Sequence, residues 1–87
     1  MAEPVKRVTF KLYASLTDLL PAGAKDHQVA VEVAAHATIQ QVIDRYQIPP
    51  KMQHLVLLNG VYIEPEARNA ELADGDTLAV WPPVAGG

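Results

Sequence analysis

Apolar residues recur at every second position in two stretches of the chain, 5–13 and 28–33, and this pattern restricts the folds that the chain can adopt. A third stretch, 77–81, is mostly apolar and lies between the turn at Asp74-Gly75 and Pro82-Pro83. Because a strand turns successive side chains to opposite faces, each stretch predicts a strand with one buried face. The residues expected on the buried faces are Val8, Phe10 and Leu12, then Val29, Val31 and Val33, and finally Leu78 and Val80.

One segment carries a clear helical pattern. Thr38 and Gln41 have the spacing of a capping box, in which each side chain bonds the other residue's backbone N–H. The apolar residues that follow have the spacing of one helix face, and they are Ile39, Val42, Ile43 and Tyr46. Because a residue before proline avoids helical dihedral angles, Pro49-Pro50 predicts that the helix ends by about Gln47 or Ile48.

A hairpin is expected around Asn59-Gly60, which lies between the apolar runs 54–58 and 61–63. Asn-Gly is the strongest short-range hairpin signal, because both residues of the tight turn need a positive φ. A two-residue turn pairs Leu58 with Val61 and Leu57 with Tyr62. If Val61 and Ile63 point toward the core, Leu57 and Tyr62 point away from it.

The expected elements follow the order strand, short turn, strand, helix, strand, strand, turn and strand. The two turns are placed at 15–20 and 65–72. For the valines to be buried, one main helix must cover one face of a mixed sheet of about five strands, which predicts a two-layer α+β fold. A chain of 87 residues makes one small domain, which we assign to residues 1–83.

The remaining residues, 84–87, are expected to form a flexible tail. Pro82-Pro83 ends the last strand, because proline cannot donate to a strand ladder. Val84, Ala85, Gly86 and Gly87 are small or β-branched and uncharged, and together they reach about 13 Å, far enough to enter a narrow channel in another protein. The reactive group of such a tail is the α-carboxylate of Gly87, which is ionised at neutral pH and needs activation before it can react. A frayed, inert end is the alternative interpretation.

The chain resembles a known family in its opening, VTFKLYASLTDLL, and more specifically in its ending, LADGDTLAVWPPVAGG. Both are similar to the ubiquitin-like sulfur carriers (MoaD/ThiS), and most closely to the small subunit of molybdopterin synthase. The resemblance implies a ubiquitin-like β-grasp fold. It also implies that an E1-like activating enzyme adenylates Gly87 with ATP, that sulfur displaces AMP to leave a thiocarboxylate, and that Gly86 belongs to the reactive end.

Further implications concern the partners. The sulfur would be delivered inside the large subunit of molybdopterin synthase, to a cyclic pterin phosphate that becomes a dithiolene. That subunit would carry the catalytic side chains, so this chain would be a non-catalytic small subunit. It would hold no cofactor of its own, since ATP would bind the activating enzyme.

An aromatic patch is expected on the sheet face that the helix does not cover. Alternation places Tyr13 and Trp81 there, and the hairpin register adds Leu57 and Tyr62. Clustered exposed aromatic residues mark interaction surfaces, and the partner-binding face of the family maps onto the same positions. Partners are expected to bind this face and the segment that leaves it. The predicted partner-binding residues are Tyr13, Leu57, Tyr62, Trp81, Pro82, Pro83, Val84 and Ala85. The alternative is that these rings only cover the sheet or pack against 65–72.

Composition argues against several other classes of function. Without cysteine the chain has no disulfide, no Cys-ligated metal and no thiol nucleophile. Its net charge of −3 does not favour nucleic acid. His27, His36 and His54 lack a regular ligand spacing, so no metal site is expected. With no signal peptide in Met1–Pro4 and no apolar run of membrane-spanning length, we expect no membrane partner and a cytoplasmic location.

Three alternatives to the molybdopterin role stay open. The chain could carry sulfur for another pathway, such as thiamin, cysteine or tungsten cofactor synthesis. It could be a ubiquitin-like modifier whose Gly87 forms isopeptide bonds with lysines. It could also be a β-grasp interaction domain with an inert tail.

Overall fold

The computed structural model describes residues 5–83 of the chain. Within this range the elements follow the predicted order, with one additional 3₁₀ turn after the helix. The strands and helices are β1 (Val5–Leu12), η1 (Ala14–Leu19), β2 (Gln28–Ala34), α1 (Ile39–Arg45), η2 (Pro50–Met52), β3 (Leu55–Leu58), β4 (Val61–Tyr62), η3 (Pro65–Ala67) and β5 (Thr77–Trp81). None of the helices in this range is long and apolar enough to cross a membrane.

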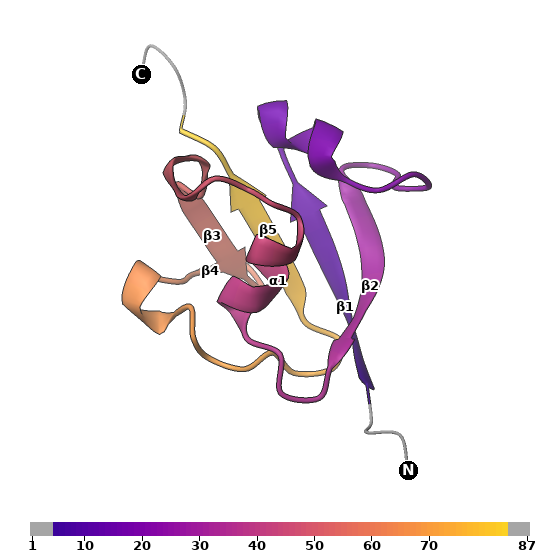
Figure 1. The fold of residues 1–87 in the computed structure, drawn as a ribbon, viewed down its shortest axis with the longest axis vertical. Helices are drawn as coiled ribbons and strands as arrows, with labels where there is room; N and C mark the ends of the chain where they lie inside the picture. The colour runs from indigo at the N-terminus through magenta and orange to yellow at the C-terminus, as the bar shows by residue number, and fades with distance from the viewer. Residues whose placement is uncertain (1–4, 84–87) are drawn as a thin grey trace.

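The strands form one mixed sheet in the order β2-β1-β5-β3-β4, with α1 packed on one of its faces (Figure 1). The first and last strands, β1 and β5, lie side by side and run parallel, whereas the other neighbours are antiparallel. This arrangement is the predicted two-layer α+β fold, and it is the ubiquitin-like β-grasp. Because β1 and β5 are parallel, β5 ends at the same end of the sheet at which η1 follows β1 (Figure 1).

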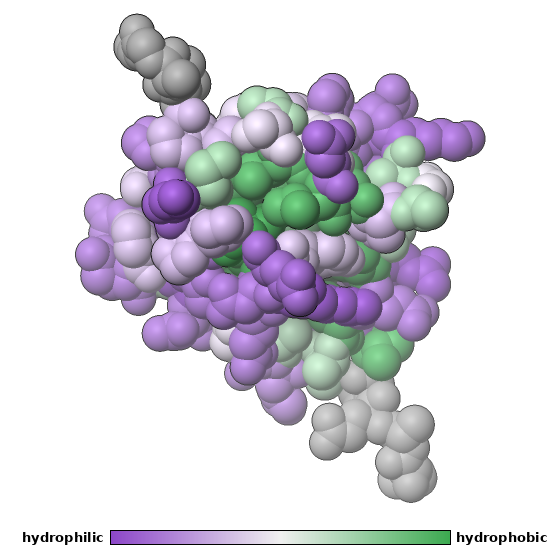
Figure 2. Space-filling view, turned by 45° about the horizontal axis from the view of Figure 1, so that its top comes forward, coloured by the Kyte–Doolittle hydropathy of each residue, from purple (hydrophilic) through white to green (hydrophobic). Residues whose placement is uncertain are grey.

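The core lies between α1 and the sheet, and it contains the alternating residues predicted to be buried. Phe10, Leu12, Leu78 and Val80 are fully buried, at 0% exposure. Phe10 stacks on Tyr46 at 4.7 Å between ring centroids, which joins β1 to the end of the helix. Apolar side chains also gather in the middle of the surface seen in Figure 2, with polar side chains around them. Complete burial of one phenylalanine, leucine or valine side chain stabilises the folded state by about 1.5–3 kcal/mol.

The start of α1 is confirmed, and the helix ends before the limit at Gln47 or Ile48 that Pro49-Pro50 predicts. The Gln41 backbone N–H donates to Thr38 Oγ1 at 3.1 Å, and the Thr38 N–H donates to Gln41 Oε1 at 3.0 Å, which completes the capping box. The helix ends at Arg45, because Gln47 takes a positive φ of 59° and turns the chain away from the helix axis. Pro49 therefore lies beyond a helix that has already ended.

The hairpin has the predicted register, with Leu57 opposite Tyr62 and Leu58 opposite Val61. Its turn residues Asn59 and Gly60 have φ values of 52° and 85°, as a tight turn of this kind requires. Val61 lies on the core side of the sheet with Leu58 and Leu78, as expected, but it is not buried, since its exposure is 63%. Val61 begins the edge strand β4 opposite Leu58, which is itself only half-buried, so the core ends before it reaches Val61.

Candidate functional site

The end of the sheet at which β5 finishes brings together two of the residues predicted to form the aromatic patch. Tyr13 follows β1 and Trp81 ends β5, and the parallel pairing of Leu12 with Val80 sets them side by side. Their rings stack with centroids 4.1 Å apart and planes within 2° of parallel. The Tyr13 N–H donates to the Val80 carbonyl at 3.3 Å, so the backbone supports the same alignment.

Backbone contacts with β3 hold Trp81, the final residue of β5, on the side opposite β1. The His54 N–H donates to the Trp81 carbonyl at 3.1 Å, and Leu55 pairs with Trp81 in the ladder between β3 and β5. Pro82 is buried, whereas Pro83 is exposed. The chain is therefore held by packing as far as Pro82, two residues before the segment predicted to act as the tail.

The hairpin residues extend this surface across the outer face, the sheet face opposite α1. Leu57 pairs with Tyr62 on β4 and with Ala79 on β5, so these three side chains share that face. Leu57 is half-buried and Tyr62 is 49% exposed. We name Tyr13, Leu57, Tyr62 and Trp81 the outer-face patch. Its members lie where the sequence predicted them, and their role in partner binding stays a prediction.

Four further predicted site residues cannot be placed. Val84, Ala85, Gly86 and Gly87 lie outside the residues that the structure describes. The assignment of 84–87 as a flexible tail, and of Gly87 as the reactive end, therefore stays a prediction.

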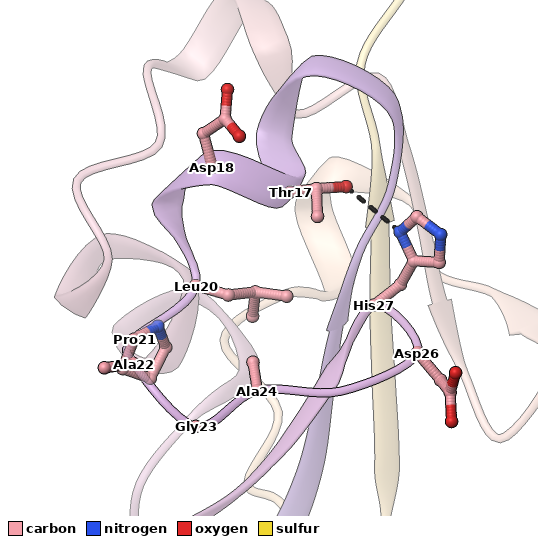
Figure 3. A pocket seen from close by; sticks show the side chains of 9 residues that line it. All are labelled: Thr17, Asp18, Leu20, Pro21, Ala22, Gly23, Ala24, Asp26 and His27. Atoms are coloured by element: carbon pink, nitrogen blue, oxygen red, sulfur yellow. Dashed lines mark hydrogen bonds between the residues drawn. The ribbon is translucent and has the colours of Figure 1, made fainter.

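His27, which lacks the sequence spacing of a metal ligand, belongs to this region. Its ring stacks on Tyr13 with centroids 5.4 Å apart, and its Nδ1 lies 3.1 Å from Thr17 Oγ1 (Figure 3). Asp26 and His27 form a tight turn at φ values of 54° and 65°. The backbone hydrogen bonds between Lys25 and Gln28, each 3.0 Å long, close this turn. Asp and His are among the non-glycine residues that tolerate positive φ best, and this was the available sequence signal for the turn.

A pocket opens beside this turn, between η1 and the 20–27 loop (Figure 3). Its charged or titratable lining residues are Asp18, Asp26 and His27. Within residues 5–83 these side chains do not form a group able to hold a metal ion, and no other cluster of three or more His, Asp or Glu does. His36, the histidine near the start of the helix, lies 3.1 Å from Glu71.

This end of the sheet has the geometry of a surface that can bind another protein. The partly exposed rings of Tyr13 and Trp81 lie beside the point at which the chain leaves β5, and aromatic residues with such exposure are common where proteins bind one another. The outer-face patch and the last described residues can therefore be contacted by the same partner.

Comparison with known proteins gives one family match and several similar structures. The sequence profile of the ThiS family matches residues 11–87. SAMP1 from Haloferax volcanii is 27% identical, covers 93% of this chain and 99% of its own, and has a TM-score of 0.67. The HVO 2177 protein of Haloferax volcanii is 25% identical over 95% of this chain and 88% of its own, with a TM-score of 0.74.

A third similar structure is a complex of subunits 1 and 2 of the molybdopterin-converting factor from Helicobacter pylori 26695. The matching chain is 20% identical, covers 93% of this chain and 99% of its own, and has a TM-score of 0.55, which supports the shared fold. A search of curated proteins found no match.

Proposed function

Because the chain belongs to the ThiS family of ubiquitin-like sulfur carriers and modifiers, we propose that it carries sulfur as a thiocarboxylate on Gly87. The observation that carries this proposal is the extent of the family match, which runs through the last strand to Gly87. We further propose that the sulfur serves molybdopterin synthesis, with this chain as the small, non-catalytic subunit of the synthase. The same proposal places the protein in the cytoplasm.

The proposed reaction has two steps at the α-carboxylate. First, a carboxylate oxygen attacks the α-phosphorus of ATP, which forms an acyl-adenylate and releases pyrophosphate. Second, a sulfur nucleophile attacks the acyl carbon and AMP leaves, so that C–S replaces C–O at Gly87. Activation is required because an ionised carboxylate is a poor electrophile. The ATP would be held by an E1-like partner, and the folded domain described here would present the carboxylate to it.

We propose that partners bind the outer-face patch. Trp81 and Tyr13 expose aromatic surface at the point where the chain leaves β5, so a protein seated on them lies next to the residues that follow Pro83. The Helicobacter pylori structure, which contains both subunits of a molybdopterin-converting factor, supports a second subunit as one such partner. The activating enzyme would use an overlapping surface, so the two partners would bind in turn.

A second candidate function is that of a protein modifier. A structural neighbour from Haloferax volcanii, 25% identical, is named small archaeal modifier protein 1. In this alternative the activated Gly87 carboxyl is transferred to a lysine amine, and an isopeptide bond forms in place of the thiocarboxylate.

Mass measurement of the protein isolated from its own cells tests these alternatives. A mass gain that corresponds to one oxygen replaced by sulfur, localised to the C-terminal peptide, is the expected result. A ladder of covalent adducts would favour the modifier. An unmodified Gly87 without adducts, both in the cells and after incubation with ATP and the host's activating enzyme, would exclude both functions.

Deletion of Gly87 provides the matched control. We expect it to abolish the sulfur-dependent mass gain and synthase activity while the melting temperature stays unchanged. A marked fall in melting temperature would contradict this expectation, because it would assign Gly87 a role in stability.

A further inference from the structure

Three aromatic rings at the ends of three neighbouring strands lie in contact where β5 finishes. His27 directly precedes β2, Tyr13 directly follows β1, and Trp81 ends β5, and these strands are adjacent in the order β2-β1-β5. Tyr13 is the middle ring, with centroid distances of 5.4 Å to His27 and 4.1 Å to Trp81. We name these residues the three-ring stack.

A hydrogen-bond chain fixes the His27 end of the three-ring stack. Thr17 Oγ1 donates its one hydrogen to the Leu12 carbonyl at 3.2 Å. The same oxygen lies 3.1 Å from His27 Nδ1, so it accepts a hydrogen from that nitrogen (Figure 3). The ring of His27 is therefore tied, through Thr17, to the end of β1 from which Tyr13 projects.

The backbone also prepares His27 for this contact. Asp26 and His27 both have positive φ, and the turn that they form is closed by two hydrogen bonds of 3.0 Å between Lys25 and Gln28. The Leu12 N–H donates to the His27 carbonyl at 3.0 Å, which joins the turn to β1. The ring thus extends from a backbone held at several points, even though the residue itself is exposed.

The other end of the three-ring stack is the last residue of β5. The Trp81 carbonyl accepts from the His54 N–H at 3.1 Å, and Pro82 is buried directly after it. The Trp81 ring lies against Tyr13 on one side, and Tyr13 in turn lies against His27. The last residue of β5 is therefore connected through ring contacts to the turn before β2.

We propose that His27 is a positioning residue for the surface on which the activating enzyme docks. It holds Tyr13 against Trp81, so that these two rings keep one orientation where the enzyme contacts the carrier. This inference rests on the proposed function. Holding the orientation before binding lowers the ordering cost of association, so loss of His27 raises KM for the carrier and leaves kcat close to its original value.

Fluorescence of Trp81 measures the three-ring stack without a partner, because the chain has one tryptophan. The variants are His27→Asn, which removes the ring and retains a residue that tolerates positive φ, and Thr17→Val, which removes the hydroxyl and retains the ring. His36→Asn is the matched control, since it replaces an exposed histidine that contacts Glu71 and not the stack. The quenching constant for acrylamide is measured on the full-length protein.

Both variants are expected to raise the quenching constant, and the control is expected to match the wild type. In adenylation assays with the host's activating enzyme, His27→Asn should raise KM about fivefold, the size expected for the loss of one aromatic contact, with kcat nearly unchanged. Thr17→Val should change KM in the same direction by a smaller factor.

Three results would overturn the positioning role. Unchanged quenching in both variants would show that His27 does not restrain Trp81. A raised KM for His27→Asn without a change in quenching would assign His27 to direct partner contact. Raised quenching with an unchanged KM would show that the orientation is not used in activation. If the wild-type protein is not adenylated at all, the proposed function fails, whereas the quenching result still tests whether the stack restrains Trp81.

Discussion

The two faces of the sheet differ in composition and exposure although the same strands build both. On the side of α1, Phe10, Leu12 and Leu78 are completely buried. On the outer face, Tyr13 and Trp81 stack at 4.1 Å and keep part of their surface exposed. Alternation along each strand separates the two sets of side chains. One strand pattern can therefore specify a buried core and a partly exposed aromatic surface together.

Ala79 shows that the outer face is packed and not simply solvated. It points away from the core, between Lys11 and Leu57 in the ladder, yet only 6% of it is exposed. The surrounding larger side chains cover this small residue. The part of the outer face around Ala79 is therefore covered by side chains.

The largest expected effect is on stability, and it follows from a cavity created by mutation on the helix side of the sheet. Phe10→Ala removes a fully buried ring that stacks on Tyr46, so it should lower the free energy of unfolding by about 3–5 kcal/mol. Urea denaturation measures this change. A loss below about 1 kcal/mol would show that the two faces contribute similarly to stability.

Trp81→Lys should have the next largest effect, on binding more than on folding. A charged side chain in place of a central interface aromatic is expected to weaken partner binding by about 30-fold, which corresponds to about 2 kcal/mol. Titration calorimetry with the activating enzyme or the large synthase subunit measures the affinity. Ala30→Lys, also on the outer face but on β2, is the matched control and should bind normally. If Trp81→Lys binds the partner with wild-type affinity, the outer-face patch is not the interface.

Thr38→Ala should produce the smallest effect, confined to the helix side. It removes the hydroxyl that accepts from the Gln41 N–H at 3.1 Å, and loss of such a cap costs about 1 kcal/mol of stability. Thermal unfolding measures this loss, and partner affinity should stay at the wild-type value. Weaker binding at a temperature where the variant is fully folded would show that the two faces are coupled.

Local patterns predicted most of the fold because they report directly on backbone geometry. The capping box at Thr38 and the turn at Asn59-Gly60 depend on residues that are close in sequence, and both have the predicted conformation. Alternation then placed Tyr13 and Trp81 on the same face. Their contact depends in addition on the strand order, because it requires β1 and β5 to be neighbours in the sheet.

Contacts between distant segments were not predictable from such patterns. Arg68 and Gln53 are 6% and 7% exposed, although polar residues of these types are usually at the surface. They are buried because Arg68 Nη1 donates to the Gln53 carbonyl at 3.4 Å, and Gln53 Nε2 donates to the Ile48 carbonyl at 2.7 Å. The contact of His27 with Tyr13 likewise depends on a turn whose residues follow no periodic pattern.

The parallel pairing of β1 with β5 has a consequence for the synthesis of the protein. Among the strands of residues 5–83, the one in the middle of the sheet is translated last, and it pairs with the strand that is translated first. A nascent chain that lacks β5 leaves an edge of β1 and an edge of β3 unpaired, and contacts so distant in sequence form late in folding. A chain that stops before β5 therefore cannot close the sheet. A molecule with a closed sheet already contains Trp81 and the strand that leads to the proposed reactive end.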